Sequence, residues 1–454
     1  MSRGFYIKTM GCQMNAHDSD YLAQSLMNKG FLPVPEPEQA QVILINTCVV
    51  RAKPEQKAYS FLGRASAIKK AHPEKFLGII GCLAQMKGER LLQRFPQVDL
   101  IMGPRELARF PEILERIDDE ARGKFVATRL DSEPPEPMAC QAHACQGVTG
   151  FVSVMEGCDN FCSYCIVPYV RGRETSRSPE AILNEAAALL SRGVKEITLL
   201  GQNVNSYLGT GKGGRRLDFS NLLHEMSRLD GLLRLRFVTS HPKDLSDDLI
   251  SCFGEMAMLC PHIHLPFQAG SNRILKRMRR GYSREDYLLL IKKLRTVQPD
   301  IAISSDVMVG FPGETEEDFE WTLDLIRRVQ FDSLFSFKYS DRTGTAAERM
   351  PDKIDERIKS SRLNTLQGIQ KDITLSKNMS LEGKELEILV EGHSKQGGQL
   401  SGRTGSNRIV NFIINDRIIG ELINVNIVRS FSNSLWGEPT DSCLSGVRAI
   451  PKSG

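Results

Sequence analysis

The chain has 454 residues, and its 59 Lys and Arg residues against 55 Asp and Glu give a net charge of +4. This length predicts two to four domains, and the small charge excludes a protein that binds nucleic acid through a global basic field. The first residues lack the apolar core of a signal peptide and no run approaches the roughly 18 apolar residues of a membrane span, which predicts a cytoplasmic protein without membrane contact.

The first predicted domain covers residues 3–120 and alternates short apolar runs with helical stretches. Strands are expected at 5–10, 42–46 and 76–80. Such alternation favours an α/β domain with a parallel sheet. A linker is predicted at 131–147, where prolines and small residues lack any periodicity.

A second predicted domain covers residues 144–375. Its strand candidates, separated by amphipathic helical stretches such as 178–193, are 151–155, 196–201, 233–238, 262–267, 302–310 and 333–339. Six such units predict a partial TIM-like (β/α)6 barrel. In barrels of this kind the chemistry gathers at the carboxyl ends of the strands.

The third predicted domain covers residues 377–442 and is rich in short strands. They are expected at 385–392, 399–404, 408–414 and 422–431, which favours a small antiparallel β-barrel of a kind often used to bind nucleic acid. Arg403 and Arg408 are its candidate RNA contacts. The region has nearly equal numbers of basic and acidic residues, so composition alone does not establish RNA binding.

Eleven cysteines in a protein without a secretion signal favour metal or cluster ligation over disulfides. Three residues separate Cys158 from Cys162 and two separate Cys162 from Cys165, directly after the first strand of the second domain. Three thiolates can hold a 4Fe–4S cluster and leave one iron open for S-adenosylmethionine (SAM). The alternative is a zinc site, which usually pairs cysteines as two CxxC motifs and needs four ligands.

A second trio, Cys12, Cys48 and Cys82, is widely spaced, and each member ends an apolar run. The carboxyl ends of neighbouring parallel strands meet along one edge of a sheet, which predicts that these thiols converge. The alternative is that they are three small buried hydrophobic residues. Cys140, His143 and Cys145 are interpreted as ordinary loop residues, and Cys252, Cys260 and Cys443 are assigned no role.

The segment GCDNFCSYCIVPYVRGRETSRSPE (157–180) resembles the radical-SAM methylthiotransferase family. The resemblance extends to about residue 440, and its blocks at 198–207, 239–244, 262–275 and 306–319 are similar to the MiaB branch, which acts on isopentenylated adenosine in tRNA. Ala269, Asp341 and Thr343 depart from the usual pattern of that branch. These departures concern fine substrate contacts and leave the cysteines untouched.

The resemblance implies a transferase that uses two 4Fe–4S clusters and two molecules of SAM to methylthiolate C2 of N(6)-isopentenyladenosine next to the anticodon. It gives Cys158, Cys162 and Cys165 the catalytic, SAM-binding cluster, and Cys12, Cys48 and Cys82 the second cluster. It identifies the C-terminal barrel as a TRAM domain. The residues that it implies for SAM contact are Gln202, Asn203, Gly310, Gly313 and Glu314.

The implied partners are tRNA, through its anticodon stem-loop, a reducing partner such as flavodoxin or ferredoxin, and a sulfur donor, with the protein expected to be a monomer. Arg171, Arg173 and Arg177 are predicted to meet the tRNA, and the basic run 273–284 is either a solvated face or a phosphate contact. Sister methylthiotransferases, acting on threonylcarbamoyladenosine in tRNA or on a ribosomal-protein aspartate, remain alternatives. So does a redox-sensing RNA-binding protein without catalysis.

Overall fold

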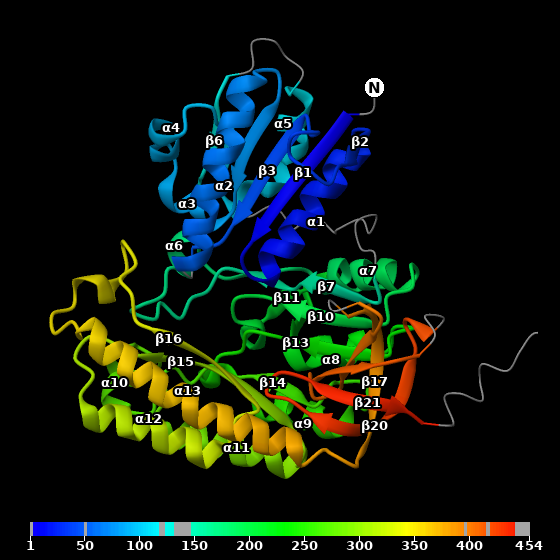
Figure 1. Ribbon diagram of the computed structural model, residues 1–454, viewed down its shortest axis with the longest axis vertical. Coiled ribbons are helices and arrows are strands. Elements are labelled where there is room, and N and C mark those ends of the chain that lie inside the picture. The colour runs from blue at the N-terminus through cyan, green and yellow to red at the C-terminus, as the bar shows by residue number, and fades with distance from the viewer. Residues whose placement is uncertain are drawn as a thin grey trace, which may run out of the picture.

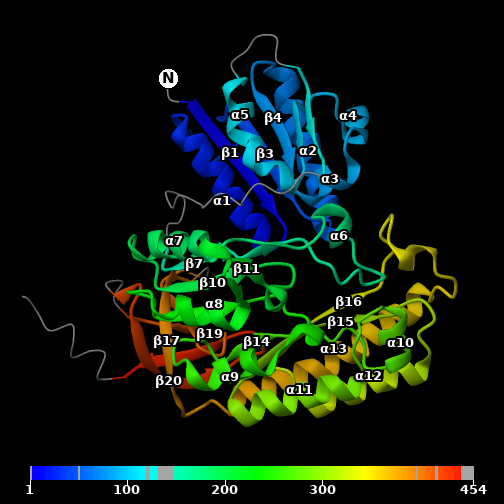
Figure 2. The same cartoon turned by 180° about the vertical axis from the view of Figure 1, so that it is seen from behind.

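The computed structural model describes residues 3–49, 52–117, 123–130, 147–394, 397–414 and 418–440. An N-terminal α/β unit stands above a partial barrel, and a closed β-barrel lies beside that partial barrel (Figures 1 and 2). Nearly all of the predicted linker, with Cys140, His143 and Cys145, lies outside the described residues, as does Cys443.

The N-terminal unit is a six-stranded sheet in which every neighbouring pair is parallel, so the predicted α/β arrangement is confirmed. In spatial order its strands are β2 (Phe31–Pro33), β1 (Arg3–Met10), β3 (Val42–Thr47), β4 (Phe76–Ile80), β5 (Leu100–Met102) and β6 (Phe125–Ala127). The three-residue strands β2, β5 and β6 were not predicted, since so short a run carries little periodicity.

Helices cover both faces of this sheet, which explains why β3 and β4 are buried along their whole length. Ile43 and Ile45 pack with Leu62 on one face, and Val42 and Leu44 pack with Leu22 on the other. The helices are α1 (Gln13–Asn28), α2 (Ala52–Ala71), α3 (Cys82–Lys87), α4 (Arg90–Arg94), η1 (Pro104–Arg109) and α5 (Phe110–Glu115).

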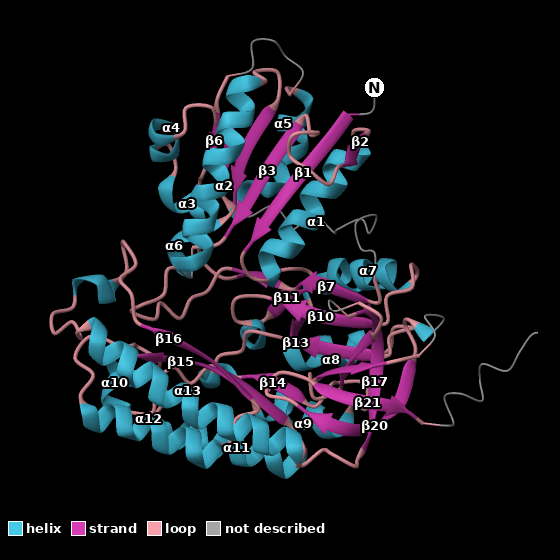
Figure 3. Cartoon of the chain, viewed as in Figure 1, coloured by secondary structure: helices cyan, strands magenta, loops and turns pink. Residues whose placement is uncertain are grey.

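The central part is an incomplete barrel of six parallel-strand units, as predicted, in two groups of three (Figure 3). One group is β7 (Thr149–Ser153), β10 (Glu196–Leu200) and β13 (Arg234–Phe237), and the other is β14 (His262–His264), β15 (Ala302–Val309) and β16 (Ser333–Lys338). A single hydrophobic core runs through both groups from Val152 to Ile373.

Helices follow the barrel strands in the chain: α7 (Pro179–Leu190), α8 (Phe219–Met226), α9 (Asp247–Glu255), α10 (Asn272–Arg277), α11 (Arg284–Val297), α12 (Glu316–Val329) and α13 (Glu356–Met379). Shorter elements lie in the connections between these strands and helices: β8 (Met155–Glu156), α6 (Val167–Val170), β9 (Thr175–Ser176), η2 (Val204–Ser206), β11 (Leu208–Thr210), η3 (Lys212–Gly214), β12 (Arg216–Asp218), η4 (Pro242–Asp244) and η5 (Ala346–Arg349). The cysteine loop at 158–165 lies between β8 and α6.

The C-terminal barrel is closed, in the order β17 (Glu385–His393), β18 (Leu400–Thr404), β19 (Ile409–Phe412), β21 (Leu435–Pro439) and β20 (Leu422–Ser430). Its pairs are antiparallel except for β19 with β21, which is parallel. The strand β21 was not predicted. Closure leaves no sheet edge open to pair with other chains.

Hydrogen bonds from β13 dock this barrel onto the central part. Arg234 donates to the carbonyl of Arg403, and Arg236 donates to the carbonyls of Thr404 and Gly405. The helix α13 continues to Met379, past residue 377 where the sequence placed the start of the third domain, so the domain limits stay a prediction. In the described part of the chain, no helix is long and apolar enough to cross a membrane.

Candidate functional site

The N-terminal cysteine trio lies at the carboxyl edge of three neighbouring strands, β1, β3 and β4. Cys48 directly follows β3, and Cys82 is the first residue of α3. The thiol of Cys48 lies within hydrogen-bonding reach of the thiols of both Cys12 and Cys82. The structure therefore brings these three thiols together, as the strand-end argument predicted.

Two buried asparagines that sequence reasoning missed brace this edge. The side-chain oxygen of Asn15 accepts from the thiol of Cys12 at 3.3 Å, and its Nδ2 donates to Oδ1 of Asn46 at 2.9 Å. Gly11 permits the close packing, since a Cβ there would lie 2.7 Å from the Cβ of Cys48. The segments GCQMN and NTC contain both asparagines, so the signal was present in the sequence.

The trio has an uneven charge environment. The hydrogen bond from Cys48 lowers the pKa of Cys12 to about 6, and the pKa of Cys82 is lowered for the same reason. Two hydrogen-bonded neighbours raise the pKa of Cys48. The positive charge of Arg171 also favours the thiolates of Cys12 and Cys82.

The second trio occupies the loop that follows β8, at the carboxyl end of the first barrel strands. The backbone N–H of Cys165 donates to the carbonyl of Cys162 at 2.9 Å, which makes a tight turn. Burial and the neighbouring Cys162 raise the pKa of Cys165 to about 12, and burial raises that of Cys158. The thiols of Cys158 and Cys162 both act electrostatically on Cys165, so the three thiols lie near one another.

Gly157 shapes the start of this loop. It has a φ of +82°, and a Cβ there would lie 2.1 Å from the carbonyl oxygen of Arg173, so only glycine fits. Its N–H donates to Oε1 of Gln202 at 2.6 Å. Gln202, predicted to contact SAM, therefore holds the cysteine loop against the end of β10.

Asn203, the next predicted SAM contact, is buried, and its amide nitrogen donates to Oδ2 of Asp244 at 2.8 Å. Its Oδ1 has no hydrogen-bond partner within the described structure. Buried polar atoms normally have partners, so this oxygen is available to a ligand.

Ser240 and His241, which the sequence analysis did not single out, carry further unpartnered atoms at the end of β13. Oγ of Ser240 and Nε2 of His241 are buried without a partner among the described residues. Burial and Arg280 lower the pKa of His241 to about 2, so the ring is neutral. Because its Nδ1 accepts from the N–H of Lys243, Nε2 carries the hydrogen.

The neighbouring Thr239 supports a ligand-binding role for Ser240 and His241. It adopts a φ of +70° that a β-branched residue rarely takes, and such backbone strain clusters at functional sites. The block TSHPKD was visible in the sequence as a family resemblance only. Nothing in its composition marked which of its atoms would be left without partners.

The glycine-rich segment after β15 is bonded mainly to other groups of the protein. The N–H of Gly310 donates to Oε2 of Glu314 at 2.6 Å, and Arg362 donates to the same oxygen at 2.8 Å. Burial raises the pKa of Glu314 to about 7 despite these partners. Gly313 has a φ of +79° and faces the guanidinium of Arg277. A Glu314 carboxylate engaged in this way is less available to SAM than predicted.

The arginines predicted to meet tRNA divide into two kinds. Arg171 and Arg177 are buried and ion-paired, with Asp18 and Glu185 respectively, so the prediction is wrong for these two. Arg173 is exposed, with 73% of its side-chain surface accessible, and it remains a candidate. The sequence placed all three just after the loop, but it did not show that Asp18 on α1 and Glu185 on α7 would pair with two of them.

The basic run 273–284 also contains both ion-paired and exposed residues. Arg273 and Arg284 form ion pairs with Asp318 and Asp324, whereas Lys276 and Arg279 are exposed. Arg280 is buried, and its guanidinium contacts the second trio: Nη1 donates to Sγ of Cys162 at 3.4 Å. This residue was missed as a site residue because it was counted within a surface charge run.

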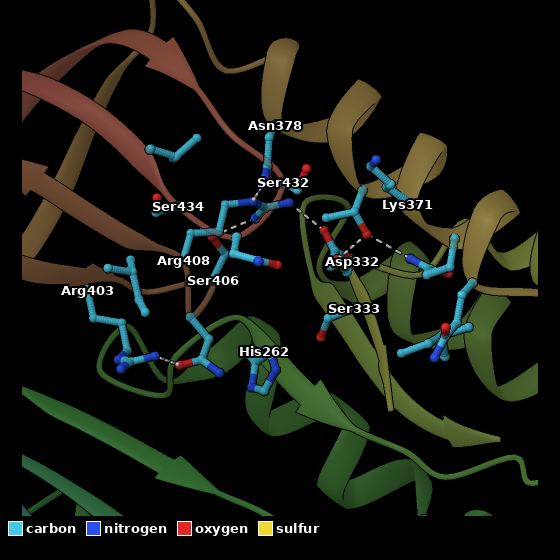
Figure 4. A pocket seen from close by; sticks show the side chains of 18 of the residues that line it. His262, Asp332, Ser333, Lys371, Asn378, Arg403, Ser406, Arg408, Ser432 and Ser434 are labelled. Carbon is cyan, nitrogen blue, oxygen red and sulfur yellow. Dashed lines mark hydrogen bonds and ion pairs between the residues drawn. The ribbon is translucent and has the colours of Figure 1, made fainter. Parts of the chain in front are cut away.

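Arg403 and Arg408 mainly hold the C-terminal barrel together and onto the core. Arg403 donates to Glu391, and Arg408 pairs with Asp332, which precedes β16 (Figure 4). They line a polar cavity of about 360 Å³ at the amino ends of β14 and β16, away from the cysteines. The prediction that these two arginines contact RNA is therefore not supported by their placement.

Both trios match an iron–sulfur cluster in donor chemistry. Three thiols converge at each place, thiolate is the ligand that such clusters take, and an arginine beside each trio offsets its negative charge. In the described ranges, no group of three or more His, Cys, Asp and Glu side chains is placed to hold a metal ion. A cluster with four irons does not require its thiolates to meet on one ion.

Comparisons with known proteins extend these observations along the chain. Residues 4–103 match the uncharacterized protein family UPF0004, residues 152–326 match the radical SAM superfamily, and residues 379–440 match the TRAM domain. A solved radical S-adenosylmethionine methyltransferase, TsrM from Kitasatospora setae, aligns with a TM-score of 0.55 at 16% identity and covers 77% of each chain. At this low identity, the similarity shows a shared fold alone.

Two curated relatives are each called tRNA-2-methylthio-N(6)-dimethylallyladenosine synthase. The one from Syntrophus aciditrophicus is 48% identical over 435 residues, which cover 95% of this chain and 94% of the relative. The one from Geobacter metallireducens is 49% identical over 433 residues, which cover 95% of this chain and 97% of the relative.

Proposed function

Because the chain belongs to the radical-SAM methylthiotransferase family, we propose that it replaces the C2 hydrogen of an N(6)-isopentenylated adenosine beside the anticodon of tRNA with a methylthio group. The observation that carries this proposal is the identity of about half the residues, across nearly the whole chain, with synthases of that product. The sister reactions on threonylcarbamoyladenosine or on a ribosomal protein are not favoured by these relatives.

The two cysteine trios would hold the two 4Fe–4S clusters. Cys158, Cys162 and Cys165 would hold the one that binds SAM, and Cys12, Cys48 and Cys82 the one concerned with sulfur. The clusters and SAM supply radical chemistry, which an aromatic C2–H requires because it is neither acidic nor a leaving group. The protein's own contribution is to bring the three thiols of each trio to one place and to neutralise their charge.

Residues at the strand ends would bind and orient the adenosine-containing ligands. Asn203, Ser240 and His241 offer a buried acceptor, a hydroxyl and a neutral N–H donor that lack partners. Gln202 fixes the cysteine loop through Gly157. We retain Gly310 and Gly313 as backbone neighbours of SAM, with Glu314 supporting their turn through its bond to the Gly310 N–H.

We further propose that a reducing partner such as flavodoxin or ferredoxin and a separate sulfur donor serve this chemistry. Because its proposed substrate is tRNA, we place the protein in the cytoplasm. We also propose that it acts as a monomer. The working domain limits are 3–120, 144–375 and 377–442, with the end of α13 shared between the last two.

Nucleoside mass spectrometry of tRNA from a strain that lacks the gene tests the proposal. The expected result is loss of the methylthio nucleoside and accumulation of isopentenyladenosine, restored by the wild-type gene but not by Cys158→Ala. Unchanged nucleosides would contradict it. SAM cleavage to 5′-deoxyadenosine under dithionite separately excludes a redox-sensing binder without catalysis.

A further inference from the structure

Arg171 belongs to the barrel loop that carries one cysteine trio, yet its side chain lies against the unit that carries the other. It directly follows α6 and is only 3% exposed. Nη2 donates to Oδ2 of Asp18 on α1 at 2.7 Å, and Nη1 donates to Oε1 of Glu156 at 2.9 Å. The guanidinium therefore bridges the two parts of the chain.

Packing fixes the position of this arginine. Ile166, which precedes α6, and Val170, its last residue, share a hydrophobic cluster with Cys82 and Leu83 of α3. Arg105 of the N-terminal unit donates from Nε to the backbone carbonyl of Arg171 at 2.7 Å. The Arg171 backbone is therefore held directly against the helix that begins with Cys82.

Gly172 permits this close contact between Arg105 and the Arg171 backbone. It has a φ of +74°, and a Cβ there would lie 2.6 Å from Cζ of Arg105. Any other residue would displace the Arg105 guanidinium from the backbone that it holds.

The Arg171 guanidinium also reaches the thiols. It is within hydrogen-bonding reach of Cys82, and its charge acts on Cys12 as well. Asp18 and Glu156 orient it through their hydrogen bonds. One buried cation is therefore shared between two carboxylates and the N-terminal trio.

We propose that Arg171 is a positioning residue that stabilises the reduced state of the cluster held by Cys12, Cys48 and Cys82. This inference rests on the proposed function, because it requires a cluster at that trio. One-electron reduction adds a negative charge to a buried site, and a fixed cation beside the thiolates favours that state. The loop that holds the SAM-binding cluster thereby also sets the reduction potential of its neighbour.

The test uses the full chain carrying Cys158→Ala, Cys162→Ala and Cys165→Ala, so that only the N-terminal cluster is reconstituted. Its midpoint potential is measured by dithionite titration monitored by electron paramagnetic resonance. Arg171→Gln should lower the ratio of reduced to oxidised cluster at fixed potential at least tenfold, a downward shift of the midpoint potential of about 59 mV or more. Arg171→Lys keeps the positive charge, so its midpoint potential should stay close to that of the parent.

Two further variants separate charge from structure. Asp18→Asn removes a negative charge from the same network and should shift the potential upward. Arg228→Gln, at an exposed barrel arginine paired with Glu225, should leave it unchanged.

Equal potentials for the parent and Arg171→Gln at full iron content would overturn the inference. Shifts of the same sign in Arg171→Gln and Asp18→Asn would also overturn it, because they indicate a merely structural role. If Arg171→Gln fails to load iron, an unshifted Asp18→Asn overturns it. A parent that binds no iron would overturn both the role of Arg171 and the second cluster of the proposed function. An iron-replete parent with unshifted variants would overturn the role of Arg171 alone and leave the proposed function standing.

Discussion

Arg280 donates from Nη1 to Sγ of Cys162 at 3.4 Å, while its Nη2 donates to the carbonyl of Pro266 at 2.8 Å. The guanidinium is buried and also packs on the ring of Tyr282. A cation fixed in this way offsets the negative charge of the thiolates. Arg171 has the corresponding place at the other trio, so each cysteine site is paired with one buried arginine from the barrel.

The two trios should be separable by iron content and by reaction. Replacing Cys12, Cys48 and Cys82 with Ala should halve the iron of anaerobically reconstituted protein from about eight to about four per chain, the count of two four-iron clusters. Methylthiolation should be lost, while SAM cleavage to 5′-deoxyadenosine continues because the barrel trio is intact. Full iron content in this variant, or loss of SAM cleavage in a folded variant, would contradict the assignment.

The exposed Arg173 should contribute to tRNA binding through phosphate. Arg173→Gln should weaken tRNA affinity and reduce the slope of log affinity against log salt by about 1, since each neutralised phosphate releases counterions. The measurement is a filter-binding or fluorescence titration at several salt concentrations. The exposed Arg228→Gln is the matched control, and equal slopes for the two variants would remove Arg173 from the interface.

The neutral N–H of His241 should bind an adenosine-containing ligand. His241→Phe keeps a ring against Tyr282, whose centroid lies 5.7 Å away, but removes the donor. A lost bond to a buried ligand costs about 1–3 kcal/mol, so kcat/KM for 5′-deoxyadenosine formation should fall about fivefold or more. A raised KM for SAM identifies SAM as the ligand, and a raised KM for the stem-loop identifies the substrate adenosine.

The control for this prediction is His224→Phe on the exposed side of α8. If His241→Phe matched that control in both KM values and in kcat, Nε2 would have no ligand. The prediction concerns a substitution at unchanged pH, because His241 stays neutral throughout the working range.

Asp20, on α1, should make the stability of the protein depend on pH. Burial raises its pKa to about 6. The folded state therefore keeps a proton that the unfolded state releases, so this group favours folding less as the pH rises from about 4 through 6. Asp20→Asn should raise Tm relative to wild type at pH 8 and leave it unchanged at pH 4. The exposed Asp230→Asn should show no such difference, and a gain equal at both pH values would contradict the assignment.

The fold was largely predictable, because the strands that define it are long or strongly apolar. β4 was predicted with its observed limits, and β1, β3 and β15 nearly so. The strands missed, such as β2 and β21, are short, or pair across a closure that sequence periodicity does not register. The convergence of Cys12, Cys48 and Cys82 was predictable because one strand precedes each cysteine.

The surroundings of the cysteines were less predictable. Arg171 and Arg280 belong to basic segments that a sequence presents as surface. Each is buried against a partner far along the chain, Asp18 for the first and Cys162 for the second. Arg408 was predicted to contact RNA, but it pairs with Asp332 instead. Charge patterns along a chain identify cations, whereas the tertiary fold decides which of them reach solvent.

The most direct test of the proposed function compares three anticodon stem-loops as substrates of the anaerobically reconstituted protein with SAM and dithionite. They are identical except that the adenosine beside the anticodon is unmodified, isopentenylated or threonylcarbamoylated, and products are identified by nucleoside mass spectrometry. We predict methylthiolation at C2 of the isopentenylated stem-loop and little turnover of the other two, because a site shaped for the prenyl chain gains binding energy only from that group. Equal turnover of the isopentenylated and threonylcarbamoylated stem-loops, or SAM cleavage without any methylthio product, would contradict the account.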